Sequence, residues 1–246
     1  MPNIEVNGLD TYYEVHGDGP PLMLLHGGFG NAPSMAPMTD ILSKHYKVYL
    51  PERRGHGHTA DPGEITYELM AEDTAGFMAA MGIEKARIAG YSDGAIICLY
   101  LGMRHPQIVE KMAPVSANFH WNGLTEHMRA VFEKSTPEAM AAILPEEVKY
   151  HRENSPDGPD RFPIFFAKMQ KLFLTEPNLT LADLAGIKVP TLVLAADRDL
   201  MTIEHTVAMH RAIEGSQLCV IPGANHALVF VRAEEVCAAV LRFLGT

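Results

Sequence analysis

One stretch decides the fold of this chain: Gly90-Tyr91-Ser92-Asp93-Gly94, which follows an apolar run at residues 86–89 and precedes a helix-like stretch at 95–104. A serine held in a sharp turn between a strand and a helix presents its hydroxyl at the carboxyl edge of a sheet. Small residues must flank such a strained turn, because larger side chains would collide there. The stretch therefore predicts that Ser92 is a nucleophile, placed at a helix N-terminus whose dipole favours developing negative charge.

The same order of elements recurs along the chain: an apolar run, a glycine-rich or polar turn, and then a stretch with helical spacing. Strand-like runs lie at 22–25, 47–50, 86–89, 111–115, 191–195 and 218–221, and helix-like stretches at 34–44, 67–81, 95–104, 204–213 and 233–243. This alternation predicts an α/β fold with a mostly parallel central sheet and helices on both faces. Runs at 4–6 and 11–16, joined by Asn7-Gly8, predict an antiparallel hairpin at its edge.

The alternation stops between residues 118 and 186, where prolines interrupt helix-like pieces. We expect this segment to be a helical cap inserted into an α/β core made of residues 1–117 and 187–246. One stretch of it carries a group of phenylalanines: Phe162, Phe165, Phe166 and Phe173. Most of these are expected to bury an apolar stripe against the core, with one or two roofing a substrate pocket.

A second glycine-rich stretch, His26-Gly27-Gly28-Phe29-Gly30, follows the strand-like run at 22–25. Such a loop can present a backbone N–H to an oxyanion, together with the N–H of the residue after the nucleophile. We expect Gly28 and Asp93 to supply these donors, with Phe29 as the alternative to Gly28. A plain tight turn is the simpler interpretation of the same glycines.

Two acids and a histidine follow the last two predicted strands. Asp197 and Asp199 come directly after residues 191–195, and His226 lies between 218–221 and the final helix-like stretch. A carboxylate here can orient a histidine and stabilise its imidazolium, and the histidine can take the proton of a serine. No histidine spacing in the chain is typical of a zinc site, so we expect neither a metal nor a cofactor.

Taken in order, these motifs resemble those of the α/β-hydrolase superfamily over essentially the whole chain. Arg54-Gly55-His56-Gly57 is similar to the R-G-x-G turn after the family's fourth strand and is interpreted as structural. The family's chain order of nucleophile, acid and histidine implies a catalytic set of Ser92, Asp199 and His226, with Asp197 as the alternative acid. Serine at position 92 argues against the haloalkane dehalogenases and epoxide hydrolases of this fold, which use aspartate there.

Within the superfamily, the Ser-Asp-Gly elbow is similar to that of the valacyclovir-hydrolase-like group and small carboxylesterases. The valacyclovir-hydrolase-like proteins split amino-acid esters and have a second glycine where this chain has Ala95. The resemblance implies that the carboxylate of Asp93 could anchor a substrate ammonium. An acid in the first helical turn is also favoured by the helix dipole by roughly 0.3–1 kcal/mol, so both interpretations stay open.

The composition excludes several classes of protein. The chain has 246 residues, of which 47% are apolar, so it can bury a sizeable core. Its formal net charge is -10 and it has no long run of Lys or Arg, so nucleic acid is not an expected partner. Cys98, Cys219 and Cys237 are too scattered for a disulfide framework. Residues 1–8 lack the features of a signal peptide and no run could cross a bilayer, which predicts a cytoplasmic protein without a membrane partner.

The resemblance implies a cofactor-free, two-step acyl transfer on a small carboxylic ester, through an acyl-enzyme on Ser92. A lactonase, a thioesterase, a carbon–carbon bond hydrolase or a cofactor-free perhydrolase would carry the same residues. So would a ligand receptor that keeps the scaffold and hydrolyses weakly. The sequence does not indicate the oligomeric state.

Overall fold

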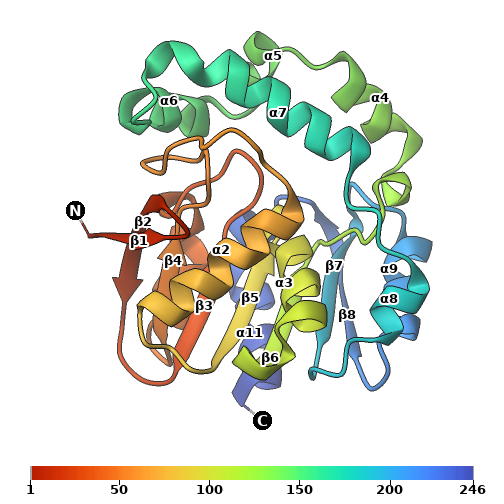
Figure 1. Ribbon diagram of the computed structural model, residues 1–246. Coiled ribbons are helices and arrows are strands. Elements are labelled where there is room, and N and C mark those ends of the chain that lie inside the picture. The colour runs from red at the N-terminus through yellow and green to blue at the C-terminus, as the bar shows by residue number, and fades with distance from the viewer. Residues whose placement is uncertain (1, 246) are drawn as a thin grey trace.

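In the computed structural model, which describes residues 2–245, eight strands form one sheet in the order β1-β2-β4-β3-β5-β6-β7-β8 (Figure 1). The strands are β1 (Asn3–Val6), β2 (Leu9–His16), β3 (Pro21–Leu25), β4 (Lys47–Pro51), β5 (Ala86–Tyr91), β6 (Val109–Val115), β7 (Leu192–Arg198) and β8 (Gln217–Asn225). The first two are antiparallel to their neighbours, and β3 to β8 are mutually parallel. The predicted mostly parallel sheet with an N-terminal hairpin edge is confirmed. Asn7 and Gly8 take positive φ angles of 52° and 78° in the hairpin turn.

Helices cover both faces of the sheet, as predicted. One face carries α2 (Tyr67–Ala80), α3 (Asp93–Arg104), α8 (Leu181–Ala185) and α9 (Ile203–Ala212), and the other carries α1 (Ala36–Leu42), α10 (Leu228–Val231) and α11 (Ala233–Gly245). The burial of strand β3 on both faces explains its apolar sequence. Met23 and Leu25 point into the first core, while Leu22 and Leu24 point into the second. Alternate residues of a strand face opposite sides, so a strand covered twice needs apolar residues throughout.

Several predicted boundaries differ by a few residues from the observed ones, and two of these differences have a clear physical reason. The single helix predicted at 34–44 is a 3-10 turn (Pro33–Met35) followed by α1, because Pro37 has no N–H with which to continue the hydrogen-bond ladder. The strand predicted at 218–221 extends to Asn225 in β8. Between the pairs Ala196–Ile221 and Arg198–Asn225, β8 has more residues than β7, and this bulge in β8 lets the strands stay paired as far as Asn225.

Four helices between β6 and β7 lie over the carboxyl edge of the sheet (Figure 1): α4 (Glu126–Lys134), α5 (Pro137–Ile143), α6 (Pro145–Asn154) and α7 (Phe162–Thr175). We call these four helices the cap. Two of the prolines that interrupt the sequence pattern, Pro137 and Pro145, begin α5 and α6, since a first helical residue needs no N–H partner. Helix α8 instead packs against α3 and α9. The boundaries at 118 and 186 stay a prediction. Short 3-10 turns occur at Pro106–Ile108, Trp121–Gly123 and Pro159–Arg161.

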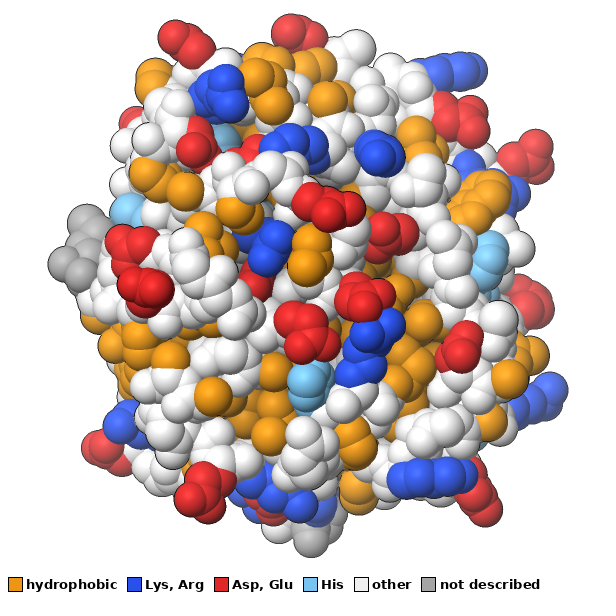
Figure 2. Space-filling view, in the orientation of Figure 1, with side chains coloured by type: hydrophobic (Ala, Val, Ile, Leu, Met, Phe, Trp, Pro, Cys, Tyr) orange, Lys and Arg blue, Asp and Glu red, His pale blue; other side chains and the backbone are white. Residues whose placement is uncertain are grey.

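The surface carries mixed charges. On the face shown in Figure 2, basic and acidic side chains are interspersed, with no continuous field of Lys and Arg. Cys98, Cys219 and Cys237 are free thiols, of which Cys98 and Cys237 are buried and Cys219 is partly exposed. None of the helices within residues 2–245 combines the length and the apolar character needed to span a bilayer.

Candidate active site

Ser92 lies in the predicted sharp turn between β5 and α3. Its backbone has φ 53° and ψ -116°, a left-handed conformation that a non-glycine residue rarely adopts. The two flanking glycines are sterically required. A Cβ atom built on Gly90 would lie 2.2 Å from the carbonyl oxygen of Gly94, and one built on Gly94 would lie 2.3 Å from the carbonyl oxygen of Leu25. The strained turn is therefore fixed by backbone packing on both sides.

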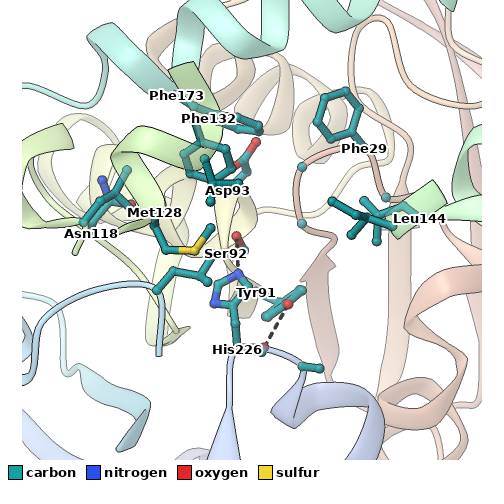
Figure 3. Close-up of a pocket in the computed structure, with 18 of the residues that line it drawn as sticks. Phe29, Tyr91, Ser92, Asp93, Asn118, Met128, Phe132, Leu144, Phe173 and His226 are labelled. Atoms are coloured by element: carbon teal, nitrogen blue, oxygen red, sulfur yellow. Dashed lines mark hydrogen bonds between the residues drawn. The ribbon is translucent and has the colours of Figure 1, made fainter. Parts of the chain in front are cut away.

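Three side chains from distant parts of the chain form one hydrogen-bonded series at this turn, and Figure 3 shows two of them, Ser92 and His226. The Nε2 atom of His226 lies 3.0 Å from the hydroxyl oxygen of Ser92, and its Nδ1 atom lies 2.6 Å from Oδ1 of Asp199. The Asp199 side chain is only 2% exposed, and that of His226 is 19% exposed. In the neutral imidazole, Nδ1 donates to the carboxylate and Nε2 accepts from the serine hydroxyl. This is the arrangement in which a histidine can remove the serine proton.

The pairing of β7 with β8 brings the acid and the histidine together. Arg198 is the register partner of Asn225, and these residues directly precede Asp199 and His226. The alternative acid, Asp197, is exposed and accepts the N–H of Gly223 instead. The structure thus places Asp199, and not Asp197, beside the imidazole.

Asp199 is held by further donors. Its Oδ2 atom accepts the Ser116 hydroxyl at 2.5 Å and the Ala196 N–H at 3.1 Å, while Oδ1 also accepts the Leu200 N–H at 2.8 Å. Burial alone would raise the pKa of this carboxyl, but the charge and hydrogen bond of His226, with the Ser116 and Ala196 hydrogen bonds, lower it instead. Asp199 is therefore ionised at neutral pH and ready to orient the imidazole.

The glycine-rich loop after β3 lies directly over the turn. A Cβ atom built on Gly28 would lie 2.8 Å from Oδ2 of Asp93 and 2.7 Å from the ring of Phe173, so any other residue there would have to displace these side chains. Phe29 has a positive φ of 56°. Among residues 2–245, no acceptor receives the backbone N–H of Gly28, Phe29 or Asp93. The three predicted oxyanion donors are thus unoccupied in the part of the chain that the structure describes.

A cavity of about 580 Å³ opens above Ser92, between the sheet edge and the cap. Its wall is mostly apolar, with residues from the core loops and the cap: Phe29, Leu124, Met128, Val131, Phe132, Met140, Leu144, Phe173, Leu200, Met201 and Phe230. Of the phenylalanines predicted to cover the core, Phe162, Phe165 and Phe166 are buried against Phe29, whereas Phe173 lines the cavity. A pocket of this size and polarity suits a small, largely apolar molecule.

Asp93 is the charged group buried in the cavity wall. Its side chain is directed toward Phe132 and Phe173 (Figure 3), and the residue is only 3% exposed. Oδ1 accepts the hydroxyl of Tyr67 at 3.1 Å, whereas Oδ2 has no partner among residues 2–245. Burial raises the pKa of this carboxyl, although the charge of Arg53 and the Tyr67 hydrogen bond oppose the change. An unsatisfied buried carboxylate oxygen is unfavourable unless a ligand donates to it.

Three residues of this region were not identified from the sequence. Ser116 bonds Asp199, Tyr67 bonds Asp93, and Arg53 bonds the glycine-rich loop. Ser116 could have been proposed as a site residue from the sequence, because it is a polar residue directly after the apolar strand β6. The sequence contains no comparable signal for Tyr67 or Arg53, because their contacts with Asp93 and Gly27 depend on the fold. Within the described residues, no three His, Cys, Asp or Glu side chains are arranged to hold a metal ion.

A protein-family model described as the alpha/beta hydrolase fold matches residues 20–153. The chain belongs to the α/β-hydrolase fold family, and the predicted resemblance is confirmed at that level. The class that this fold and site define is that of hydrolases.

Individual relatives span nearly the whole chain at low identity. The human protein named serine hydrolase BPHL is 25% identical, over 94% of this chain and 82% of its own length. The pimeloyl-acyl-carrier-protein methyl ester esterase of Vibrio vulnificus is 21% identical, over 96% of this chain and 98% of its own. The crystal structure of the enol-lactonase from Burkholderia xenovorans LB400 superposes with a TM-score of 0.81 and 23% identity, covering all of both chains. At that identity the structural likeness concerns the fold alone.

Proposed function

We propose that this chain is a serine hydrolase that cleaves a small carboxylic ester through an acyl-enzyme on Ser92. The observation that carries the proposal is the hydrogen-bonded series from the Ser92 hydroxyl through His226 to Asp199, at 3.0 and 2.6 Å. A serine hydroxyl is a weak nucleophile at neutral pH and needs an adjacent base, which this series supplies. The unoccupied N–H groups of Gly28 and Asp93 supply the second requirement, donors for an oxyanion.

The proposed reaction has two steps. His226 Nε2 takes the Ser92 proton as the oxygen attacks the ester carbonyl, and the oxyanion is held by the N–H groups of Gly28 and Asp93. The carbon–oxygen bond to the alcohol then breaks, and His226 returns the proton to the departing alcohol. Water attacks the acyl group after losing a proton to His226, and the acid leaves as Ser92 regains its hydrogen. Asp199 keeps the imidazole oriented and stabilises its charged form without taking the proton.

Two observations support a small carboxylic ester as the substrate: the character of the cavity and the name of one relative. The cavity of about 580 Å³ has room for a small molecule and a mostly apolar wall, which suits an acyl chain. Among the relatives, the Vibrio vulnificus protein is named as a methyl ester esterase. A small-molecule ester, handled without a cofactor, is the substrate class that we expect, and the cytoplasm stays our expected location.

The direct test is turnover of p-nitrophenyl esters by the wild type and by Ser92→Ala. Loss of the nucleophile should lower kcat roughly a millionfold, as in serine hydrolases generally. Ser43→Ala, at the end of α1, is a matched control that should keep full activity. A Ser92→Ala variant that retained most of its activity would refute the proposal.

A second candidate is an amino-acid ester, favoured by the partnerless Oδ2 of Asp93 in the cavity wall. A substrate ammonium donating to this oxygen would satisfy a buried carboxylate beside the reacting carbonyl. A hydrogen bond to a charged group contributes about 1.5–3 kcal/mol, which corresponds to roughly 10- to 100-fold. Asp93→Asn should therefore reduce the preference for α-amino esters over acyl esters by that factor. An unchanged preference would exclude the amino-acid ester and leave the simple ester.

A further inference from the structure

Arg53 is a buried cation with an unusual set of partners. The residue is 4% exposed, and within residues 2–245 it forms no ion pair with a carboxylate. Its guanidinium donates instead to two backbone carbonyls of the glycine-rich loop: Nη1 to His26 at 2.5 Å and Nη2 to Gly27 at 2.8 Å. Burial lowers the pKa of Arg53 to about 10, so the group remains charged at neutral pH. The Asp93 carboxylate partly offsets this charge through space, but the hydrogen bonds of the guanidinium to main-chain oxygens are made with the loop.

The Gly27 carbonyl determines where the next N–H points. In a trans peptide the C=O and the following N–H lie in one plane and point in opposite directions. Arg53 fixes the Gly27 oxygen on its own side of the loop, so the Gly28 N–H is directed away from Arg53. Gly28 lies over Asp93 at the elbow and lines the cavity. The guanidinium therefore holds the peptide in the orientation that a donor to an oxyanion requires, and a flip of this peptide would turn the carbonyl into the site.

The neighbouring contacts hold the same loop from both ends. The Gly27 oxygen also accepts the Gly30 N–H at 3.1 Å, which closes a tight turn. Glu52, next to Arg53 in sequence, accepts the Ala32 N–H at 3.2 Å. Glycines are the residues most free to flip, so Gly27 and Gly28 need such anchors more than other residues would.

We propose that Arg53 is a positioning residue of the oxyanion hole: its guanidinium holds the Gly27–Gly28 peptide so that the Gly28 N–H faces the reacting oxygen. This inference rests on the proposed function for the oxyanion, but the orientation of the peptide is independent of it. The role also selects Gly28 over Phe29 as the donor from this loop.

The test compares Arg53→Met with Arg54→Met. Arg54 is the matched control, because it is a buried arginine of the same turn whose guanidinium bonds Asp73 and the Glu64 carbonyl instead of the loop. Since one lost oxyanion donor lowers turnover about 100-fold or more, Arg53→Met should lower kcat about 100-fold and leave KM within about threefold. The inhibition constant of a small alkylboronic acid, whose adduct with Ser92 places an oxygen in the oxyanion hole, should rise by a similar factor. Arg54→Met, corrected for folded protein, should show neither change.

Arg53→Lys should fall between the wild type and Arg53→Met, because an ammonium keeps the charge but lacks the planar fork that binds two carbonyls. Equal losses in Arg53→Met and Arg54→Met, or an unchanged boronic acid affinity in Arg53→Met, would overturn the proposal. A wild type that neither hydrolyses esters nor binds the boronic acid would contradict the proposed function instead. In that case a crystal structure of Arg53→Met still decides about the loop: a flipped or split Gly27–Gly28 peptide supports the positioning role, and an unchanged peptide refutes it.

Discussion

The sheet edge and the cap face the same cavity, but the residues at the edge are held tightly by their surroundings, whereas those of helix α4 in the cap are not. At the edge, backbone contacts leave no room for side chains at Gly90 or Gly94, and Asp199 is held by several donors. In the cap, α4 contributes Met128 and Phe132 to the cavity but has no fully buried residue. The contrast suggests that the edge determines the reaction and that the cap, through the volume and polarity of exchangeable side chains, determines the substrate.

The largest effect that tests this division is expected at the sheet edge. Asp199→Asn should lower kcat about ten-thousandfold, since an amide in this place favours the wrong imidazole tautomer. Asp197→Asn, two residues away, should change kcat less than twofold because its carboxylate bonds the Gly223 N–H. Steady-state kinetics on one ester at pH 7 measures both. Similar losses in the two variants would mean that the observed pairing with His226 is not the working one.

A smaller effect, of a different kind, is expected from the cap. Phe173→Ala should enlarge the cavity next to Asp93 and Gly28 while leaving the hydrogen-bonded series at Ser92 intact. Because a methylene in an apolar pocket contributes about 1–3 kcal/mol, the ratio of kcat/KM between octanoate and acetate esters should rise about tenfold or more. A uniform loss on all chain lengths would instead place Phe173 in the catalytic machinery and weaken the division between edge and cap.

The site at the sheet edge could be predicted from the sequence only in part. The elbow, the histidine and the alternation of strands and helices depend on local steric rules, so they were visible in short motifs around Ser92 and His226. The resemblance implied Asp199 with Asp197 as the alternative, but the physical reason for Asp199 is the register of β7 with β8, which includes a bulge after Ile221 that no local pattern encodes. The contacts of Tyr67 with Asp93 and of Arg53 with Gly27 join residues 26 positions apart in sequence, and they likewise follow only from the fold.

The smallest expected effect is on the free energy of unfolding. It arises from two carboxylates of the sheet edge, Asp93 and Asp199, whose pKa values are shifted in opposite directions. The raised pKa of Asp93 means that the native state binds its proton more tightly than the unfolded state does, so the free energy of unfolding falls as pH rises through that pKa. Asp199, whose pKa is lowered, has the opposite sign and adds stability that is lost as the pH falls through its folded pKa.

Asp93→Asn should therefore be more stable than the wild type at pH 7 by on the order of 1 kcal/mol, and the difference should shrink toward pH 4. Urea unfolding at the two pH values measures it. A variant that is destabilised equally at both would show that the Asp93 carboxylate is satisfied in the native protein.

In the proposed mechanism an acyl group passes through Ser92. The most direct measurement is acid quenching of the wild type during turnover of p-nitrophenyl butyrate, followed by mass spectrometry of its peptides. We predict one butyryl group on the peptide that contains Ser92, and none on that peptide in Ser92→Ala. A butyryl group on another residue, or continued ester turnover with no acyl-enzyme and an unreactive Ser92, would contradict this mechanism.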